Sequence, residues 1–338
     1  MQLFVGESGG VRRIRALWRL LGQFVVFVVA TALFTSLLAL AWFFVRRGEL
    51  TPGGPTGTAP NFPALLFIGS LGSVLGVFLS VWLSGRYLDR RPFADFGFHL
   101  GGGWWLDLLF GLALGALLMT FVFLIELGSG WVKIIGAFES ARPGTPFALA
   151  ILLPAGPFVC VGVYEETLSR GYQLRNAAEG LNYPALGPRG AILLAWILSS
   201  IFFGALHVGN PNATFLSTAN ITLAGILLGL GYVLTGELAI PIGLHITWNF
   251  FQANVYGFPV SGLRPVGAMF LEIAQGGPES WTGGPFGPEA GLIGVAAMIL
   301  GGLLITLWVR LRGGKLAIHT PLAEGPRPDR ESLHPPER

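Results

Sequence analysis

The segment Tyr164-Glu165-Glu166-Thr167-Leu168-Ser169-Arg170-Gly171 decides how the rest of the chain is interpreted. It closes an apolar run from about Phe147 to Val163. An ionised carboxylate at the centre of a membrane helix costs about 3 kcal/mol. On a helix Glu166 and Arg170 can pair, whereas Glu165 points about 100° away. We therefore expect Glu166 and Arg170 to neutralise each other and Glu165 to be free for chemistry. The alternative is a helix end at the water interface with solvated charges.

The composition indicates a membrane protein that crosses the bilayer several times. The 338 residues are 52% hydrophobic and 12% charged, with a mean hydropathy of +0.65, whereas soluble domains carry about 25% charged residues. The net charge of +3 is modest and the basic residues cluster at span ends. This pattern favours the lipid bilayer as a partner and argues against nucleic acid. The single cysteine, Cys160, excludes an internal disulfide and a cysteine-based zinc site.

Eight apolar segments are each long enough for the roughly 20 residues that a bilayer requires. They cover residues 16–45, 63–84, 104–127, 147–170, 190–207, 214–234, 238–256 and 290–309. The expected fold class is all-α, a polytopic transmembrane helical bundle of about eight spans. We divide the chain into three N-terminal transmembrane helices (1–144), a core (145–256), a loop with the last transmembrane helix (257–310) and a disordered charged tail (311–338).

Eight spans place both termini on the same side of the membrane, where most basic residues also fall. That side carries Arg12, Arg13, Arg15, Arg19, Arg86, Arg90, Arg91, Arg170, Arg175, Arg310, Arg312 and Lys315. The opposite side carries Arg46, Arg47, Lys133, Arg142 and Arg264. The positive-inside rule makes the first side cytoplasmic. We therefore expect an integral, multi-pass protein of a bacterial cytoplasmic membrane, with both termini in the cytoplasm.

Few other polar groups of catalytic capacity lie within these spans. They are His207 at the end of the fifth span, and His245 with Asn249 in the seventh. His245 and Asn249 share one helix face, as do Phe203 and His207. If the fourth and fifth spans form a hairpin, Glu165 and His207 lie at the same height. Straight helices would leave His207 and His245 at different depths, so a kinked or tilted fifth or sixth helix is expected.

These side chains are consistent with two kinds of hydrolase. In one, Glu165 is the general base for a water, a histidine assists, and His245 with Asn249 donates hydrogen bonds to the oxyanion. In the other, Glu165, His207 and His245 hold a divalent metal such as zinc, because two His and one Glu are common catalytic zinc ligands. No cofactor is certain, and zinc stays an open alternative. A third interpretation gives each histidine only a helix–helix hydrogen bond.

Three short motifs occur in order in this region. They are Glu165-Glu166-x-x-x-Arg170, Phe203-x-x-x-His207 and His245-x-x-x-Asn249. Together they resemble the CPBP family, which comprises the CAAX prenyl endopeptidases, their bacterial relatives and the bacteriocin-processing or immunity proteins, also called Abi proteins. The resemblance covers about residues 145–256.

The resemblance implies a CAAX-type intramembrane glutamate endopeptidase, often described as a metalloprotease. It implies that Glu165 activates water together with His207, and that His245 and Asn249 form the oxyanion hole. The residues that it implies as support for the site are Glu166, Arg170 and Phe203. The implied substrate is a membrane-anchored peptide or protein, prenylated and CAAX-like in the eukaryotic members.

Two other functions remain as alternatives. A non-catalytic membrane scaffold or bacteriocin-immunity protein of the same fold would keep these residues for structure alone. A transporter with a proton relay would be expected to contain an inverted repeat, and the sequence displays none.

Overall fold

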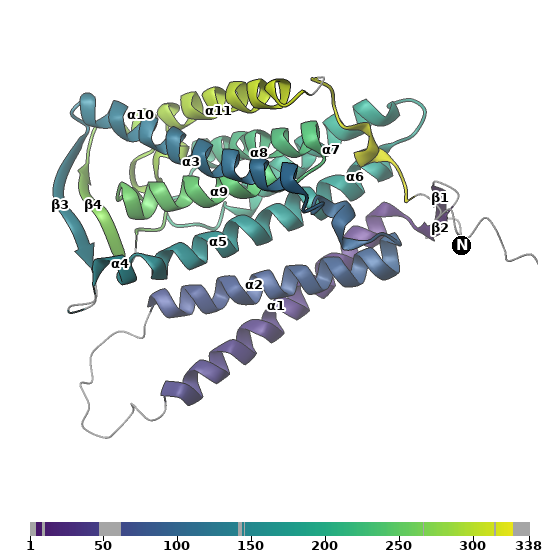
Figure 1. The fold of residues 1–338 in the computed structure, drawn as a ribbon, viewed down its shortest axis with the longest axis horizontal. Helices are drawn as coiled ribbons and strands as arrows, with labels where there is room; N and C mark the ends of the chain where they lie inside the picture. The colour runs from purple at the N-terminus through teal and green to yellow at the C-terminus, as the bar shows by residue number, and fades with distance from the viewer. Residues whose placement is uncertain are drawn as a thin grey trace, which may run out of the picture.

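Long apolar helices that run roughly side by side make up most of the molecule (Figure 1). The computed structural model describes residues 5–8, 11–46, 62–140, 144, 146–265, 267–313 and 316–326. The long helices are α1 (Ala16–Arg46), α2 (Phe62–Ser84), α3 (Gly102–Gly128), α5 (Leu152–Glu166), α7 (Gly187–Leu206), α8 (Phe215–Thr235), α9 (Ala239–Phe250) and α11 (Leu292–Leu311). The shorter helices are α4 (Phe147–Ala150), α6 (Arg175–Leu181) and α10 (Glu279–Thr282).

The helices confirm the expected all-α polytopic bundle. Seven helical stretches in the described part of the chain are long and apolar enough to cross a membrane. One of them runs from Phe147 to Leu181 and joins α4, α5 and α6 through the π-helical segment η4 (Thr167–Leu174). The seventh expected span corresponds to α9 (12 residues), which the π-helical segment η5 (Phe251–Val255, 5 residues) continues. This helix is short and lies buried within the bundle.

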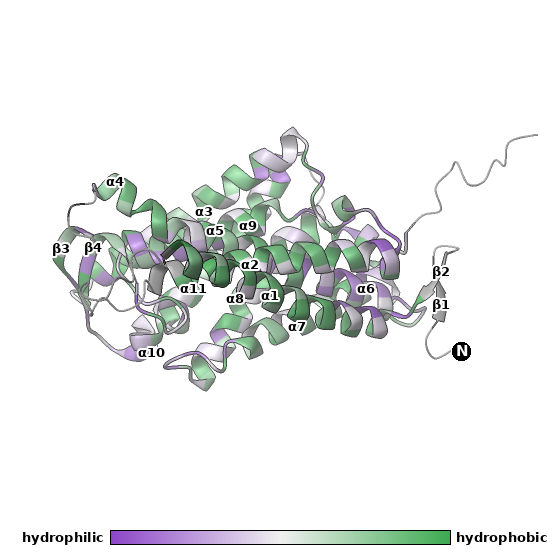
Figure 2. Cartoon of the chain, turned by 90° about the horizontal axis from the view of Figure 1, so that it is seen from below, coloured by the Kyte–Doolittle hydropathy of each residue, from purple (hydrophilic) through white to green (hydrophobic). Residues whose placement is uncertain are grey.

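Apolar side chains cover the outside of the bundle as well as its interior. Helix α1 has a mean hydropathy of 2.5 in its most apolar window, of which only 6% is buried. The helices are mainly green in Figure 2, and the hydrophilic residues gather around α6 and at helix ends. Exposed apolar surface of this extent marks a site of membrane contact. The protein is therefore an integral, multi-pass membrane protein.

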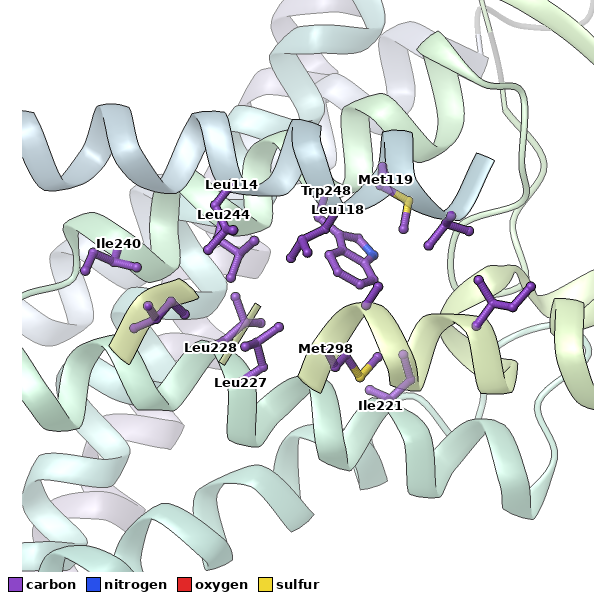
Figure 3. Close-up of a cluster of buried hydrophobic side chains, with 14 of the residues drawn as sticks. Leu114, Leu118, Met119, Ile221, Leu227, Leu228, Ile240, Leu244, Trp248 and Met298 are labelled. Carbon is purple, nitrogen blue, oxygen red and sulfur yellow. The ribbon is translucent and has the colours of Figure 1, made fainter. Parts of the chain in front are cut away.

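Glycine contacts fix the position of α9 in the bundle. A Cβ atom at Gly111 of α3 would lie 2.4 Å from the carbonyl oxygen of Ile240, and one at Gly115 would lie 2.5 Å from that of Leu244. Only glycine permits such a close approach of two helix backbones. Next to this contact lies the main apolar cluster, in which Trp248 of α9 packs among side chains of α3, α8 and α11 (Figure 3).

Two segments between the expected spans contain strands. Strand β3 (Val132–Ser140) pairs antiparallel with β4 (Ala268–Gln275), with a register shift between Ile134 and Gly136. This sheet lies at the end of the bundle opposite the termini, whereas β1 (Val5–Ser8) and β2 (Val11–Ile14) pair near the N-terminus (Figure 1).

The expectation of a disordered tail was wrong for residues 316–326. The short 3₁₀ helix η8 (Thr320–Ala323) packs against α6 and α7, and Leu322 and Ala323 are buried. The side-chain amide of Asn182 donates a hydrogen bond to the carbonyl of Ala323 at 2.9 Å. These contacts explain why a segment with two prolines is ordered. Residues 314–315 and 327–338 of the expected tail lie outside the described residues.

Candidate active site

The carboxylate pair stands where an α-helix changes to a π-helix. Glu166 is the last residue of α5, and η4 begins at Thr167. Short π-helical segments inside α-helices are frequent at functional sites. The two carboxylates differ in environment: the side chain of Glu165 is 20% exposed and that of Glu166 is fully buried. The expectation of a solvated helix end does not fit Glu166.

Glu166 is the centre of a buried ionic network. Its Oε1 atom accepts a hydrogen bond from Nη1 of Arg170 at 2.8 Å, which confirms the pairing expected from the spacing. The same oxygen lies 2.8 Å from Nδ1 of His245. Because an ionised carboxylate only accepts hydrogen bonds, Nδ1 of His245 carries the proton in this contact. Glu166 therefore holds together the fourth and seventh expected spans.

Arg170 extends this network to two further helices. Its Nη2 atom donates to the carbonyl of Gly225 in α8 at 3.0 Å. Its guanidinium carbon lies 4.5 Å from the centre of the Phe203 ring in α7, a cation–π distance. The side chain is 1% exposed. Phe203 also lies against the rings of His207 and His245, at 4.9 and 6.2 Å between centroids.

Glu165 is placed apart from the ionic network. Its Oε2 atom lies 3.9 Å from Nε2 of His245, beyond hydrogen-bond distance. Its Oε1 atom accepts a hydrogen bond from the Tyr164 hydroxyl at 3.1 Å. Arg170 donates to Glu166 and not to Glu165. The geometry thus gives the two adjacent carboxylates different partners.

His207 and His245 line the same cavity although they lie at opposite ends of their helices along the sequence. Both α7 and α9 begin at the termini end of the bundle, but Leu174 and Ala178 pack against the first half of α7, near Ile192. Helix α7 therefore starts further from the site and reaches it only in its last turn, whereas α9 reaches it in its second. Both α7 and α8 are continuous α-helices.

His207 follows the last residue of α7, and its ring folds back along the helix. Its Nδ1 atom lies 2.8 Å from the carbonyl oxygen of Phe203. A carbonyl oxygen accepts hydrogen bonds, so Nδ1 is the protonated nitrogen in this contact. Nε2 of His207 is then an unprotonated acceptor in the neutral ring.

A cavity of about 470 Å³ joins the predicted residues. Its wall includes Glu165, His207, His245 and Asn249, the four residues predicted to be catalytic, and also Phe203. Most of the remaining lining is apolar, from α5, α8 and α9. A largely apolar cavity with a few convergent polar groups is the usual form of a binding or active site.

The same cavity wall contains Glu289, which the sequence analysis missed. Glu289 precedes α11, and its carboxylate accepts hydrogen bonds from the Ser261 backbone N–H and the Gln252 side-chain amide. Burial raises the pKa of Glu289 to about 7. The only sequence signal is an acidic residue at the start of an apolar span.

Glu165, His207 and His245, the three side chains considered as metal ligands, line the same cavity. Within the described residues, which include Glu165, His207 and His245, no group of three or more His, Cys, Asp or Glu side chains is arranged to hold a metal ion. Nδ1 of His245 and Nδ1 of His207 each face an oxygen of the protein, so Nε2 is the ring nitrogen that each histidine leaves for other contacts. The chemistry proposed below uses only protein groups.

The fold and the site define a class: a multi-pass helical membrane protein with a carboxylate–histidine cavity inside its bundle. One protein family matches part of the chain. Residues 146–251 match the family of type II CAAX prenyl endopeptidases, Rce1-like, which confirms the CPBP resemblance of the three motifs. Comparisons with curated proteins and with solved structures found no match. The matched region contains every predicted site residue.

Proposed function

We propose that the protein is an intramembrane endopeptidase that hydrolyses a peptide bond of a membrane-anchored substrate with a water activated by Glu165. The observation that carries this proposal is the unequal pair of carboxylates. The Glu166 carboxylate contacts both Arg170 and His245 at hydrogen-bond distance. The Glu165 carboxylate faces the cavity, and its distance of 3.9 Å to His245 is too long for a hydrogen bond. A general base must keep a lone pair free for the proton that it accepts.

In the proposed reaction Glu165 removes a proton from the water, and the oxygen attacks the peptide carbonyl carbon. Nε2 of His207 accepts a second hydrogen bond from the same water and so orients it. The tetrahedral intermediate then collapses, the C–N bond breaks, and the proton held by Glu165 passes to the leaving amine. General acid–base catalysis of this kind contributes about 10²–10⁴-fold in rate.

The negative charge that develops on the carbonyl oxygen needs donors. We assign this role to the side-chain N–H of Asn249 and to the ring of His245, which the Glu166 carboxylate holds in place through Nδ1. Loss of one such donor costs about 10²–10³ in turnover.

We place both termini on the cytoplasmic side of a bacterial cytoplasmic membrane. The support for this orientation is the excess of arginine at the termini end, including Arg86, Arg90, Arg91 and Arg312. The substrate class is a membrane-anchored polypeptide, with a prenylated CAAX-like tail as the form that the family name suggests.

The test is cleavage of a membrane-anchored peptide library by purified protein in lipid nanodiscs. We expect the wild type to cleave, Glu165→Gln to be inactive, and a zinc chelator to leave the wild-type rate unchanged. Loss of cleavage with chelator would replace the Glu165–water mechanism with a metal site. Failure of the wild type to cleave any member, when folded, would contradict the proposed activity.

A further inference from the structure

A second cavity, of about 1030 Å³, lies at the termini end of the bundle, beside α6 (Figure 1). It shares no lining residue with the site cavity, so it is a separate feature of the molecule. Its wall comes from the end of α2, the segment around the 3₁₀ helix η3 (Phe93–Phe96), the start of α6, the turn before α9 and residues 319–326. Four arginines line it, namely Arg86, Arg90, Arg91 and Arg175.

Arg175, the first residue of α6, is buried in this wall without a carboxylate partner. The residue is 9% exposed. Its Nη1 atom donates to the carbonyl of Asp95 and its Nη2 atom to that of Pro321, both neutral acceptors. Nε has no hydrogen-bond partner within the described part of the chain. A buried guanidinium is costly unless an anion and further hydrogen bonds compensate its charge.

The carboxylates of the same wall are directed elsewhere. Oδ2 of Asp95 lies 3.7 Å from Nη1 of Arg91, and Oε1 of Glu237 lies 2.7 Å from Nδ1 of His99. The third carboxylate belongs to Glu324, an exposed residue. In the described ranges none of these three forms an ion pair with the buried arginine of α6. Its charge is therefore not neutralised by the protein.

The positive potential of Arg175 acts on its neighbours in the wall. Burial, and next the charge of Arg175, lower the pKa of Arg91 to about 10. The same two causes, in the same order, lower the pKa of His319. The attraction of Asp95 for Arg91 opposes this effect without cancelling it. An anion in the cavity would relieve the repulsion among these cationic groups.

The other two arginines of the wall lie at the level of the membrane surface. Arg86 and Arg90 are exposed, and neither has an ion pair within the described residues. Tyr87 lies between them in the sequence and is 67% exposed, and Trp105 at the start of α3 is 51% exposed. Exposed tyrosine and tryptophan side chains mark the headgroup level of a bilayer. The arginines are thus placed where lipid phosphate groups lie.

We infer that this cavity binds a phosphate group, and its position and volume favour the headgroup of a phospholipid as the source. The planar fork of guanidinium N–H donors matches phosphate oxygens. The Nε–H of Arg175 is a donor without a protein acceptor, and Arg86 and Arg90 supply further charge. A cavity of this size accommodates a whole headgroup. The inference does not depend on the proposed protease activity.

Binding is measured through thermal unfolding of the full chain in dodecyl maltoside, a detergent without phosphate, because a ligand of the folded state raises the melting temperature. The probes are dioleoylphosphatidylglycerol, dioleoylglycerol with the same acyl chains but no phosphate, and inorganic phosphate at matched ionic strength. We expect a rise with phosphatidylglycerol and none with dioleoylglycerol. A rise with inorganic phosphate but not with phosphatidylglycerol would support the site and make a soluble phosphate compound its ligand. Equal rises with both lipids, or no rise with any probe, would overturn the inference.

The site is located with a double variant, Arg86→Gln with Arg90→Gln, in which both changes are at exposed positions. The matched control is Arg264→Gln, exposed on the loop before β4 at the other end of the bundle. We expect the double variant to need at least about tenfold more phosphatidylglycerol for the same rise, because charge-assisted hydrogen bonds are lost. Arg264→Gln should respond like the wild type.

Arg175→Gln should remove the response to phosphatidylglycerol altogether. If this buried variant does not fold, the double variant decides alone. A double variant that responds at the same lipid concentration as the wild type would overturn the inference, since the phosphate would then bind elsewhere.

Discussion

At the scale of single residues, the site depends on how two neighbouring carboxylates are divided between structure and chemistry. Glu166 is buried and shared by Arg170 and His245, so it joins α5, η4 and α9. Glu165 faces the cavity with a partly exposed side chain. Their spacing along a helix predicted the first pairing, since residues four apart are neighbours. The contact of Glu166 with His245 links segments far apart in the sequence, and the sequence analysis did not foresee it.

Arg170 is expected to resist even replacement by lysine. Its guanidinium bonds both Glu166 and the Gly225 carbonyl and lies over Phe203. Lysine keeps the charge but not this planar, forked geometry. Arg170→Lys should lower the stability by about 1–3 kcal/mol, because one buried partner loses its hydrogen bond. Thermal unfolding in detergent is the measurement, and the exposed Arg86→Lys is the control. Equal melting temperatures for the two variants would contradict the network.

Glu289 predicts a dependence of stability on pH. Burial raises its folded-state pKa to about 7, so the folded protein favours the neutral acid. The stabilising contribution is complete below pH about 4.5, the ordinary pKa from which that of Glu289 is raised. It is lost as the pH rises through about 7, and is constant above that.

Glu289→Gln should remove this fall in melting temperature between pH 4.5 and 7. The variant should also be more stable than the wild type at pH 8, since its amide carries no charge to desolvate. Melting curves over this pH range, with wild type beside variant, are the measurement. If the melting temperatures of both proteins fall equally with pH, the loss of stability belongs to a group other than Glu289.

At the scale of secondary-structure elements, the close contact of α3 with α9 sets the position of His245 and Asn249. Gly111 and Gly115 are four residues apart, a spacing that indicates a close-packing helix face but does not indicate the partner helix. The π-helical segments, strands β3 and β4, and the packed segment 316–326 were not predicted either. Each of these depends on contacts between distant parts of the chain, such as the bond from Asn182 to Ala323, which local patterns do not encode.

Gly115→Ala tests this contact. A methyl group there would lie 2.5 Å from the Leu244 carbonyl oxygen and 2.7 Å from the Trp248 backbone nitrogen. Backbone atoms cannot move aside as a side chain can, so α3 and α9 must separate. We expect a loss of about 1–3 kcal/mol in stability and at least a tenfold fall in turnover, because small displacements of catalytic groups are costly.

The matched control is Gly69→Ala in α2, where a Cβ atom meets nothing within 4 Å. This variant should keep wild-type activity and be as stable or slightly more stable, since alanine favours helix over glycine by about 1 kcal/mol. Similar behaviour of the two variants would mean that the contact of α3 with α9 does not set the site.

At the scale of the whole molecule, composition and the spacing of apolar runs were sufficient to predict a transmembrane helical bundle. All eight expected spans correspond to helices, and the three motifs lie around one cavity. The full lining of the cavity was not apparent from the sequence, because segments far apart along the chain contribute to it. Glu289 illustrates the reason: it lies far from the motifs along the chain, and only folding brings it to the same wall.

The most direct test of the central claim compares Glu165→Gln with Glu166→Gln, for turnover of the membrane peptide library and for thermal unfolding. We predict that Glu165→Gln melts like the wild type and loses turnover by about 10³-fold or more, as expected for a missing general base. Glu166→Gln should lose about 3 kcal/mol of stability, because Arg170 is left as a buried charge without its partner. Wild-type turnover in folded Glu165→Gln would contradict the role of Glu165 as the general base.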